Sequence, residues 1–451
     1  MLATALCLVA LAGPGSCSNP LVLSAPVRAP SGVSNYIDNG FVSFSIAAHF
    51  FPEYAGNLTS PNLFTRTLLR VLARSTGKAP YIRVGGTSSQ KLALNITQEG
   101  QDGVPKTETI GPTYFEGFYN FPGSRFHFDL ANADLGPNRV PNAVAEAKIA
   151  LSYIKGNLES FEIGNEPNVY NFQGYRPANY SQDDYVGEWS QIATAVSENV
   201  LTGNQYGINP RTSFQALTYF LGPFGSSSFD VTSAFNTSHV DQDGFVKSAS
   251  LHIYPAGANP SRQHLFMNHT NTASTLDVLI PAIKYLATSY PNIPLVLGET
   301  NSDYINIGNQ ADVSAFGNSL WVCDYMLYAM SINVKRVYMH QGTTFGYSDF
   351  TPTEVRPPFY GQLLVAAAIG TSPRMQIKPV NLGLWNLSIY AMYTESILSK
   401  YVVINLEEWN ETTPYDRPFR SFNLEVPSDV HVTSKDKSKY DIRLLKFFGV
   451  L

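Results

Sequence analysis

The sequence predicts an α/β fold, a (β/α)8 TIM barrel with a small C-terminal all-β, sandwich-like domain. From residue 41 to about residue 370, eight short apolar segments alternate with stretches of helical periodicity. Beyond Thr371 the helical patterns stop, and short strand-like segments separated by turns follow. A doubly wound open sheet is the main alternative, but no glycine-rich dinucleotide-binding loop follows the first predicted strand.

The barrel strands are predicted where apolar segments of five to seven residues occur: Phe41–Ala47, Pro80–Val84, Arg125–Leu130, Glu159–Gly164, Thr212–Leu217, Ser248–Tyr254, Pro294–Gly298 and Lys335–His340. Helices are predicted after most of them, for instance at Asn62–Ser75, Val140–Ile154, Asp183–Val200, Ser274–Ser289 and Asp312–Ser331. Parallel strands need such crossover helices because each strand must return to the same end of the sheet.

Four regions are expected along the chain. Residues 1–18 form a signal peptide, residues 19–35 contribute a strand to the β-domain, residues 36–370 form the barrel, and residues 371–451 form the β-domain. The strands of the β-domain are predicted at Met375–Pro379, Leu387–Tyr393, Tyr401–Leu406, Phe422–Val426 and His431–Thr433.

A signal peptide is indicated by the apolar run from Leu2 to Ala12, followed by small residues at Ser16 to Ser18. The run has no preceding Lys or Arg, so a buried N-terminal helix is the alternative. No later segment has the ~18 apolar residues of a membrane span. Asn-x-Ser/Thr sites occur at Asn57, Asn95, Asn179, Asn236, Asn268, Asn386 and Asn410, which fits a glycosylated, secreted protein.

The composition excludes some partners and sites. Charged residues make up 14% of the chain and the net charge is −5, without a basic run, so nucleic acid is not an expected partner. Cys7 and Cys17 lie in or beside the signal peptide, which leaves Cys323 alone in the mature chain. We therefore expect a buried thiol and neither an intrachain disulfide nor a cysteine-built metal site.

Two carboxylates are predicted at the same end of the barrel. Glu166 follows the fourth strand in Phe161-Glu-Ile-Gly-Asn-Glu-Pro167, and Glu299 follows the seventh. In a parallel barrel the active site lies at the C-terminal ends of the strands, and glycoside hydrolysis requires one protonated and one ionised carboxyl group there. Taken singly, Glu166 could be a turn residue and Glu299 a charge at a helix start.

Other catalytic patterns are missing from the sequence. No Gly-x-Ser-x-Gly elbow, His-Glu-x-x-His motif or phosphate-binding loop occurs, and the histidines lack the spacing of metal ligands. We therefore expect no metal and no organic cofactor.

Six motifs resemble one family in their order and spacing, from about residue 20 to 435: Phe41-Val-Ser-Phe-Ser-Ile46, Tyr81-Ile-Arg-Val-Gly-Gly-Thr87, Phe161-Glu-Ile-Gly-Asn-Glu-Pro167, His252-Ile-Tyr-Pro255, Leu297-Gly-Glu-Thr-Asn301 and Arg356-Pro-Pro-Phe-Tyr-Gly361. The family is glycoside hydrolase family 79, the β-glucuronidases and heparanase, and the secreted fungal members are the most similar.

The resemblance implies roles for four residues. Glu166 would be the general acid/base and Glu299 the nucleophile. Asn165 would bind the 2-hydroxyl of the sugar, and Tyr254 would donate a hydrogen bond to the nucleophile. An ordinary aromatic at the barrel rim is the alternative for Tyr254.

Further substrate contacts are implied at two strand ends. Gly86 and Thr87 would lie at the far edge of the sugar. Gln341 and the turn at Gly346 and Tyr347 would bind the glucuronate carboxylate, since backbone N–H groups and a phenol can do so without Arg or Lys.

The sequence departs from the family at two places. Ala47 and Ala48 stand where the family has a carboxylate facing the sugar hydroxyls, with Glu53 the nearest acid. This change would weaken hydroxyl binding or make room for a 4-O-methyl group. Residues from Asp436 to Leu451 do not resemble the family's continuation, so we expect a β-domain that is incomplete at its C terminus.

The expected function is that of a secreted, retaining glycoside hydrolase that cleaves β-linked glucuronic or 4-O-methylglucuronic acid from glycoconjugates. Its partner would be a carbohydrate substrate, and no membrane span is expected. Two alternatives stay open: another retaining β-glycosidase of the same clan, or a catalytically weakened carbohydrate-binding glycoprotein that keeps the fold.

Overall fold

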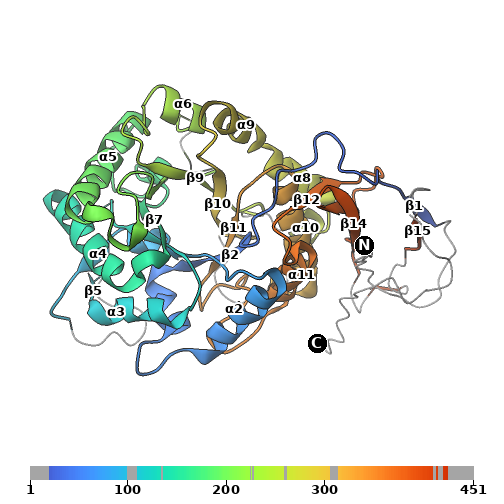
Figure 1. The fold of residues 1–451 in the computed structure, drawn as a ribbon, viewed down its shortest axis with the longest axis horizontal. Helices are drawn as coiled ribbons and strands as arrows, with labels where there is room; N and C mark the ends of the chain where they lie inside the picture. The colour runs from blue at the N-terminus through green and yellow to red at the C-terminus, as the bar shows by residue number, and fades with distance from the viewer. Residues whose placement is uncertain are drawn as a thin grey trace.

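The computed structural model describes residues 20–98, 109–133, 136–223, 225, 228–257, 262–304, 313–409, 413–414 and 420–424. Its main body is a closed barrel of eight parallel strands surrounded by helices, and a small antiparallel sheet lies beside it (Figure 1). The predicted fold class, a TIM barrel with a small β-region, is therefore confirmed.

The barrel strands follow the predicted segments: β2 (Val42–Ala47), β3 (Ile82–Gly85), β6 (Phe126–Leu130), β7 (Leu158–Ile163), β8 (Phe214–Phe220), β9 (Val246–Ile253), β10 (Leu295–Thr300) and β11 (Val337–Gln341). Each pairs with the next in the chain, and β11 pairs with β2 to close the ring. Helices cover the outside and side chains fill the inside, so these strands are buried on both faces and read as apolar runs.

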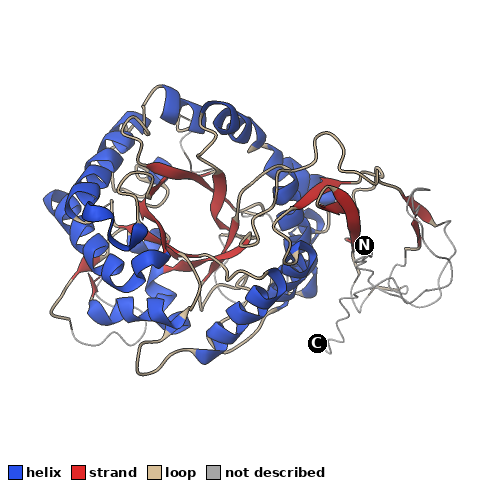
Figure 2. Ribbon diagram, in the orientation of Figure 1, coloured by secondary structure: helices blue, strands red, loops and turns tan. Residues whose placement is uncertain are grey.

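The long helices form the outer ring (Figure 2): α2 (Leu63–Thr76), α4 (Arg139–Ile154), α5 (Gln182–Asn199), α8 (His269–Asp277), α9 (Ile280–Ser289), α10 (Phe316–Ser331) and α11 (Pro357–Ile369). The helix predicted over Ser274–Ser289 is two helices, α8 and α9. Pro281 lies in the first turn of α9, where its missing N–H is tolerated, but it could not continue α8.

The small sheet contains β12 (Met375–Pro379), β13 (Leu387–Thr394) and β14 (Ile397–Asn405). The N-terminal segment lies against this region, since β1 (Leu21–Leu23) pairs with β15 (Phe422–Leu424) and Leu398 N donates to Val27 O at 2.8 Å. The predicted signal peptide and the strand predicted at 431–433 lie outside the described residues.

The sheet is joined to the barrel by a buried polar contact. Tyr390 of β13 donates its hydroxyl proton to Asp324 Oδ1 of α10 at 2.6 Å, and His269 Nδ1 lies 3.0 Å from the same oxygen. The neighbouring Cys323 is buried, as predicted, and its thiol donates to Gly361 O at 3.3 Å.

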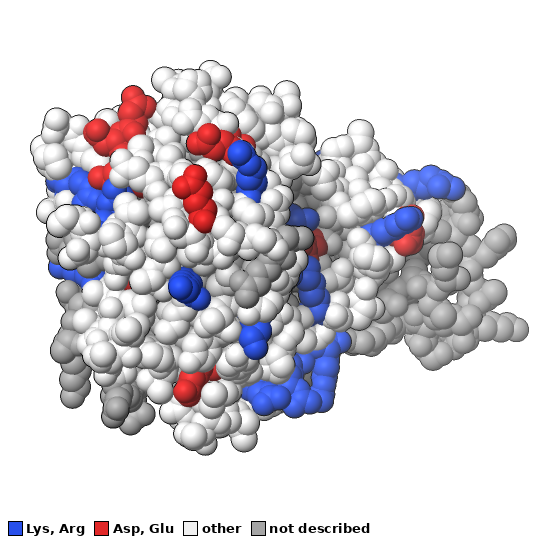
Figure 3. Space-filling model, turned by 60° about the vertical axis from the view of Figure 1, so that its left-hand side comes forward, with Lys and Arg blue, Asp and Glu red and all other residues white. Residues whose placement is uncertain are grey.

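The face shown in Figure 3 is mostly uncharged, with Lys, Arg, Asp and Glu side chains scattered over it. None of the helices in the described ranges is long and apolar enough to cross a membrane. Of the predicted glycosylation sites, Asn95, Asn179 and Asn236 are exposed and Asn57, Asn268 and Asn386 are half-buried, whereas Asn410 lies outside the described residues.

Candidate active site

Glu166 lies directly after β7, at the end of the barrel where the strands terminate. Its backbone has φ 53° and ψ 54°, a left-handed conformation that costs a non-glycine residue about 1–3 kcal/mol. Hydrogen bonds hold this turn: Glu166 N donates to Thr218 O at 3.1 Å, and Val169 N donates to Glu166 O at 2.9 Å. The side chain is left at the barrel rim, 12% exposed.

Glu299 lies in β10 at a break in strand register. Pairing with β9 shifts between Leu297 and Glu299, and such a bulge re-aims the side chain. A Cβ at the intervening Gly298 would lie 2.1 Å from Ser250 Oγ, so only glycine fits there. Tyr254 donates to Glu299 Oε1 at 2.7 Å, as the resemblance implies.

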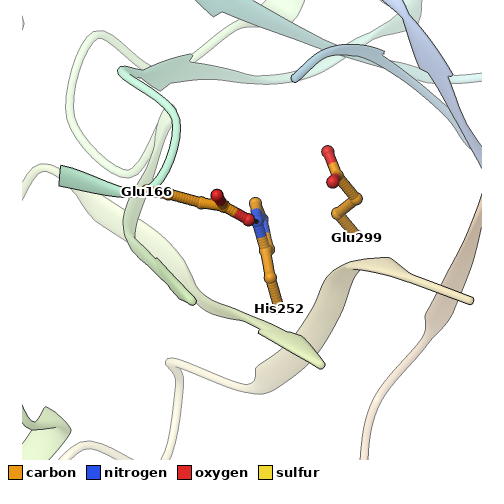
Figure 4. Close-up of side chains that lie close together, drawn as sticks. All are labelled: Glu166, His252 and Glu299. Atoms are coloured by element: carbon orange, nitrogen blue, oxygen red, sulfur yellow. Dashed lines mark hydrogen bonds and ion pairs between the residues drawn. The ribbon is translucent and has the colours of Figure 1, made fainter. Parts of the chain in front are cut away.

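The two carboxyl groups face each other across a short gap (Figure 4). One ligand atom each of Glu166, His252 and Glu299 lies within 4.8 Å of the others. His252 Nδ1 is 3.0 Å from Glu166 Oε1, so the imidazole contacts the Glu166 carboxyl group.

The Glu166 carboxyl group is held in its protonated form. Burial raises its pKa well above the ordinary value, and the negative charge of Glu299 raises it further, whereas Arg83 acts in the opposite direction. Burial also lowers the pKa of His252 to about 3, so this imidazole stays neutral beside Glu166 at neutral pH. Glu166 is therefore equipped to donate a proton.

The Glu299 carboxyl group is held in its ionised form. Burial acts to raise its pKa, but the imidazole of His340, the guanidinium of Arg83 and the hydrogen bond from Tyr254 outweigh burial and keep the pKa well below its usual range. Burial lowers the pKa of His340 itself to about 4, so the permanent cation near Glu299 at neutral pH is Arg83.

Arg83 of β3 is fully buried and connects the site. Its Nη1 donates to Glu299 Oε2 at 2.6 Å and to Ser45 Oγ at 3.0 Å. Its Nη2 donates to Asn165 Oδ1 at 2.8 Å and to Glu162 Oε1 at 2.5 Å. The planar fork thus holds the ionised carboxylate and the amide in one fixed geometry.

Asn165 presents an amide donor at the floor of the site. Arg83 fixes its Oδ1, so its Nδ2 faces the other way. That Nδ2 atom is buried and has no hydrogen-bond partner among the described residues. A buried donor without a partner is costly unless a ligand completes it, which fits a substrate hydroxyl.

A cleft of about 760 Å³ opens above these groups. Five of its aromatic lining residues form a chain of ring contacts with centroid separations of 5.3–6.1 Å, in the order Phe220, Tyr304, Tyr254, Tyr347 and Phe345. Other lining residues are mostly polar, among them His49, Thr87, Ser88, Lys91, Gln173, His340 and Thr344. A cleft with apolar and polar walls suits a sugar ring, which has both C–H faces and hydroxyl edges.

Three of the predicted substrate contacts lie at the cleft. Thr87 and Tyr347 line it directly. Gly86 has φ 93°, and a Cβ there would lie 3.4 Å from Glu299 Oε2, so glycine permits both the backbone conformation and the close approach.

Two further predicted contacts, like Gly86 and Asn165, are not among the residues that line the cleft. Gln341 is fully buried: its Nε2 donates to Asp349 Oδ2 at 2.9 Å, and its Oε1 accepts from Asp349 N at 2.9 Å. Its amide therefore supports the loop after β11, and its contact with substrate stays a prediction. Gly346 is also absent from the lining, although Phe345 and Tyr347 on either side belong to it.

Ala47 lines the cleft and presents a methyl group at the position where the resemblance predicts a carboxylate. Sequence reasoning missed three further residues, Arg83, His252 and His340. Each is a polar residue inside a predicted apolar strand, and Arg83 and His252 stand within motifs already quoted. A charge or imidazole in a strand buried on both faces was the signal that could have identified them.

Proximity alone would let Glu166, His252 and Glu299 hold a metal ion, but their chemistry does not favour it. Both oxygens of Glu299 already accept hydrogen bonds, and the raised pKa of Glu166 favours its protonated form. A protonated carboxyl group is a poor metal ligand.

Comparisons with known proteins agree with one another. A β-glucuronidase of Aspergillus niger is 31% identical over 457 aligned residues, which cover 92% of this chain and 81% of that protein. A β-glucuronidase of Neurospora crassa is 29% identical, covering 96% and 85%. The crystal structure of a 4-O-α-L-rhamnosyl-β-D-glucuronidase from Fusarium oxysporum has a TM-score of 0.72 at 21% identity, covering 87% of this chain and 82% of that one. A scan of protein-family profiles finds no match.

Proposed function

This chain belongs to glycoside hydrolase family 79, the family of the fungal β-glucuronidases, and we propose that it releases β-linked glucuronic acid with retention of anomeric configuration. The supporting observation is a pair of carboxyl groups with oxygens within 4.8 Å and pKa values shifted in opposite directions. Retaining enzymes place these groups about 5–5.5 Å apart, and inverting enzymes need roughly 6.5–9.5 Å to admit water.

In the first step, a carboxylate oxygen of Glu299 attacks the anomeric carbon and forms a glycosyl–enzyme ester. The bond to the leaving oxygen breaks as Glu166 donates its proton to that oxygen. His252 is neutral and 3.0 Å from Glu166 Oε1, so an Nδ1–H donor there would leave the other carboxyl oxygen to carry the proton.

In the second step, Glu166 is ionised and accepts a proton from water, which attacks the same carbon and expels Glu299. Charge develops on the sugar ring in both transition states, and Asn165 Nδ2, a buried donor without a described partner, would donate a hydrogen bond to the 2-hydroxyl of the sugar. The rate should follow a bell-shaped pH profile, with the acidic limb set by Glu299 and the basic limb by Glu166.

The glycone is proposed to carry a free or methylated 4-hydroxyl group. Ala47 supports the methylated form because it lines the cleft with a methyl group and not with a carboxylate. The test compares kcat/KM for 4-nitrophenyl β-D-glucuronide and its 4-O-methyl derivative in wild type and Ala47→Glu. A larger loss for the methylated substrate supports the proposal; equal values for the two substrates in both proteins refute it.

The reaction type is tested by hydrolysis of 4-nitrophenyl β-D-glucuronide, with the product anomer followed by NMR. We expect β-glucuronic acid to appear first and then to mutarotate. Initial formation of the α-anomer would refute retention. A panel with the β-glucoside and β-xyloside tests the substrate class: preference for either over the glucuronide would favour another glycosidase activity of the same clan.

We further propose that the protein is secreted. The support is the N-terminal apolar run together with exposed acceptor sites at Asn95, Asn179 and Asn236. Expression in a fungal host followed by endoglycosidase treatment tests it, since secreted protein should lose mass. Retention of unglycosylated protein inside the cell would contradict the proposal.

A further inference from the structure

His340 ends β11 and has no part in the two proton transfers. It lines the cleft, is 5% exposed, and its Nδ1 lies 3.6 Å from Glu299 Oε2. That separation is too long for a hydrogen bond. A side chain this close to the nucleophile must nevertheless border the sugar ring whose anomeric carbon the nucleophile attacks.

The hydrogen bonds around Ser45 determine which nitrogen of His340 carries the proton. Arg83 can only donate, and its Nη1 donates to Ser45 Oγ at 3.0 Å. The hydroxyl group of the fully buried Ser45 lies 3.0 Å from His340 Nδ1 and can donate its proton to it. When Nδ1 accepts from Ser45, the proton of the neutral ring is on Nε2.

The Nε2 atom lies on the side of the ring that faces Gly86 and Glu299. A Cβ at Gly86 would lie 3.8 Å from His340 Nε2 and 3.4 Å from Glu299 Oε2, and both of these side chains line the cleft. Ring stacking on Phe345, with centroids 5.4 Å apart and planes inclined by 30°, keeps the imidazole in this orientation.

The neighbouring strand changes what this wall can recognise. On β2, next to β11, Ala47 lines the cleft with a methyl group, so β2 adds no carboxylate to the Glu299 carboxylate already beside His340. A sugar hydroxyl can pair with a donor or an acceptor. A carboxylate or an ether oxygen can only accept, and of these three side chains only His340 offers it a donor.

Resting on the proposed function, we propose that His340 is a specificity-determining residue whose Nε2–H binds an acceptor oxygen of the glycone. That oxygen is either the C6 carboxylate of glucuronate or an alkylated 4-oxygen. The relay from Arg83 through Ser45 fixes the proton on the nitrogen that faces the sugar.

The test uses His340→Leu, which removes the donor, and His340→Gln, whose amide places an N–H near the former Nε2. Kinetics are measured with 4-nitrophenyl β-D-glucuronide, its 4-O-methyl derivative and the β-D-glucoside; where turnover is too slow, the competitive inhibition constant replaces KM. Circular dichroism and thermal melting check that each variant is folded. His127→Gln, at a buried histidine bonded to Ser160 and Tyr338 at the opposite end of the barrel, is the control.

If His340 binds the carboxylate, His340→Leu should lower kcat/KM for both glucuronides about 10- to 100-fold, mainly through KM, since a hydrogen bond to a charged group contributes ~1.5–3 kcal/mol. The value of kcat/KM for the glucoside should change little. His340→Gln should restore most of the preference for glucuronides over the glucoside. If His340 binds the 4-oxygen, His340→Leu should lower kcat/KM for the 4-O-methyl substrate alone. The control should alter the melting temperature without altering these ratios.

Two results would overturn the proposal while leaving the proposed function intact. An equal loss of kcat on all three substrates would mean that His340 only positions Glu299, and unchanged kinetics in His340→Leu would mean that it contacts nothing. If wild type hydrolyses neither glucuronide, the proposed function and this inference both fail.

Discussion

The two ends of the barrel have opposite charge arrangements. At the N-terminal ends of the strands, Asp38 is bonded to Lys78 at 2.8 Å and to Arg336 at 2.6 Å. Glu159 is bonded in the same region to Arg125 at 2.6 Å and Lys247 at 3.4 Å. At the C-terminal ends, one buried cation, Arg83, contacts the carboxylates of both Glu162 and Glu299, and Asp129 and Glu166 lie close to it.

The carboxylates at the N-terminal end of the barrel contribute to stability, and those at the C-terminal end are suited to proton transfer. At the N-terminal end the cations outweigh burial, so the pKa of Glu159 is lowered to about 2 and that of Asp38 is lowered further. At the catalytic end burial prevails at most sites, and the pKa values of Glu166 and Asp129 are raised well above normal. Glu299 is the exception there because Arg83, Tyr254 and two imidazoles surround it. The end with too few cations is the end that can hold a proton ready for transfer.

The largest effect is expected from neutralising one carboxylate at each end. Glu299→Gln should lower kcat on 4-nitrophenyl β-D-glucuronide on the order of 10⁴-fold or more, since the nucleophile is lost. Asp38→Asn should leave kcat within about twofold and lower the melting temperature, because Lys78 and Arg336 lose a partner. Steady-state kinetics and melting curves distinguish the two. Substantial turnover by folded Glu299→Gln would refute its assignment as nucleophile.

Replacing the buried arginine at each end of the barrel by lysine should affect activity at one end and stability at the other. Arg83→Lys keeps a cation but cannot reach Glu162, Asn165 and Glu299 together, so kcat/KM should fall roughly 10²- to 10³-fold. Arg336→Lys should leave kcat/KM nearly unchanged and reduce the free energy of unfolding by about 1–3 kcal/mol. Both are measured by kinetics and urea unfolding. Loss of activity in Arg336→Lys at full stability would contradict the separation of the two ends.

The sequence predicted the architecture and the two carboxylates because these leave local signals. The eight apolar runs reflect strands buried on both faces, and Glu166 and Glu299 follow two of them directly. Gln341 also stands at a strand end, but its amide is hydrogen-bonded to Asp349 eight residues later, so its predicted contact with substrate stays a prediction. The side chain that a strand-end residue contacts depends on the loop that follows, which a local pattern does not determine.

Arg83 is a site residue whose contacts could not be predicted from the sequence. Its partners are Ser45 of β2, Glu162 and Asn165 in and directly after β7, and Glu299 of β10, so they come from three other strands. The sequence around Arg83 contains no signal that identifies these four partners. Networks of this kind follow from the closed barrel as a whole, so they become visible only after the eight strands are placed in order.

A matched pair of Glu→Gln changes should give opposite pH dependence of stability. Glu146, at the catalytic end, has its pKa raised by burial to about 8 and accepts from Ala131 N. Above pH ~4.5 the unfolded chain loses this proton while the folded chain keeps it, so wild-type stability falls as pH rises to about 8. Glu146→Gln removes that loss and should gain up to about 3 kcal/mol at pH 7.

Glu159 should behave in the opposite way. Its lowered pKa contributes stability that is present above pH ~4.5 and is lost as pH falls toward about 2. Glu159→Gln should therefore destabilise the protein by roughly 1–3 kcal/mol at pH 7 and by little at pH 2–3. Unfolding curves at several pH values test both variants. A shared sign of the pH dependence would contradict the proposed difference between the two ends.

The most direct measurement of the central claim is covalent labelling of the nucleophile. The wild-type protein is treated with 2-deoxy-2-fluoro-β-D-glucuronyl fluoride, whose second step is slow because the fluorine destabilises the oxocarbenium-like transition state. Peptide mass spectrometry should find one 2-deoxy-2-fluoroglucuronyl group, bound to Glu299. Attachment to Glu166 or Glu162, or an active enzyme that forms no adduct and releases the α-anomer, would contradict the account.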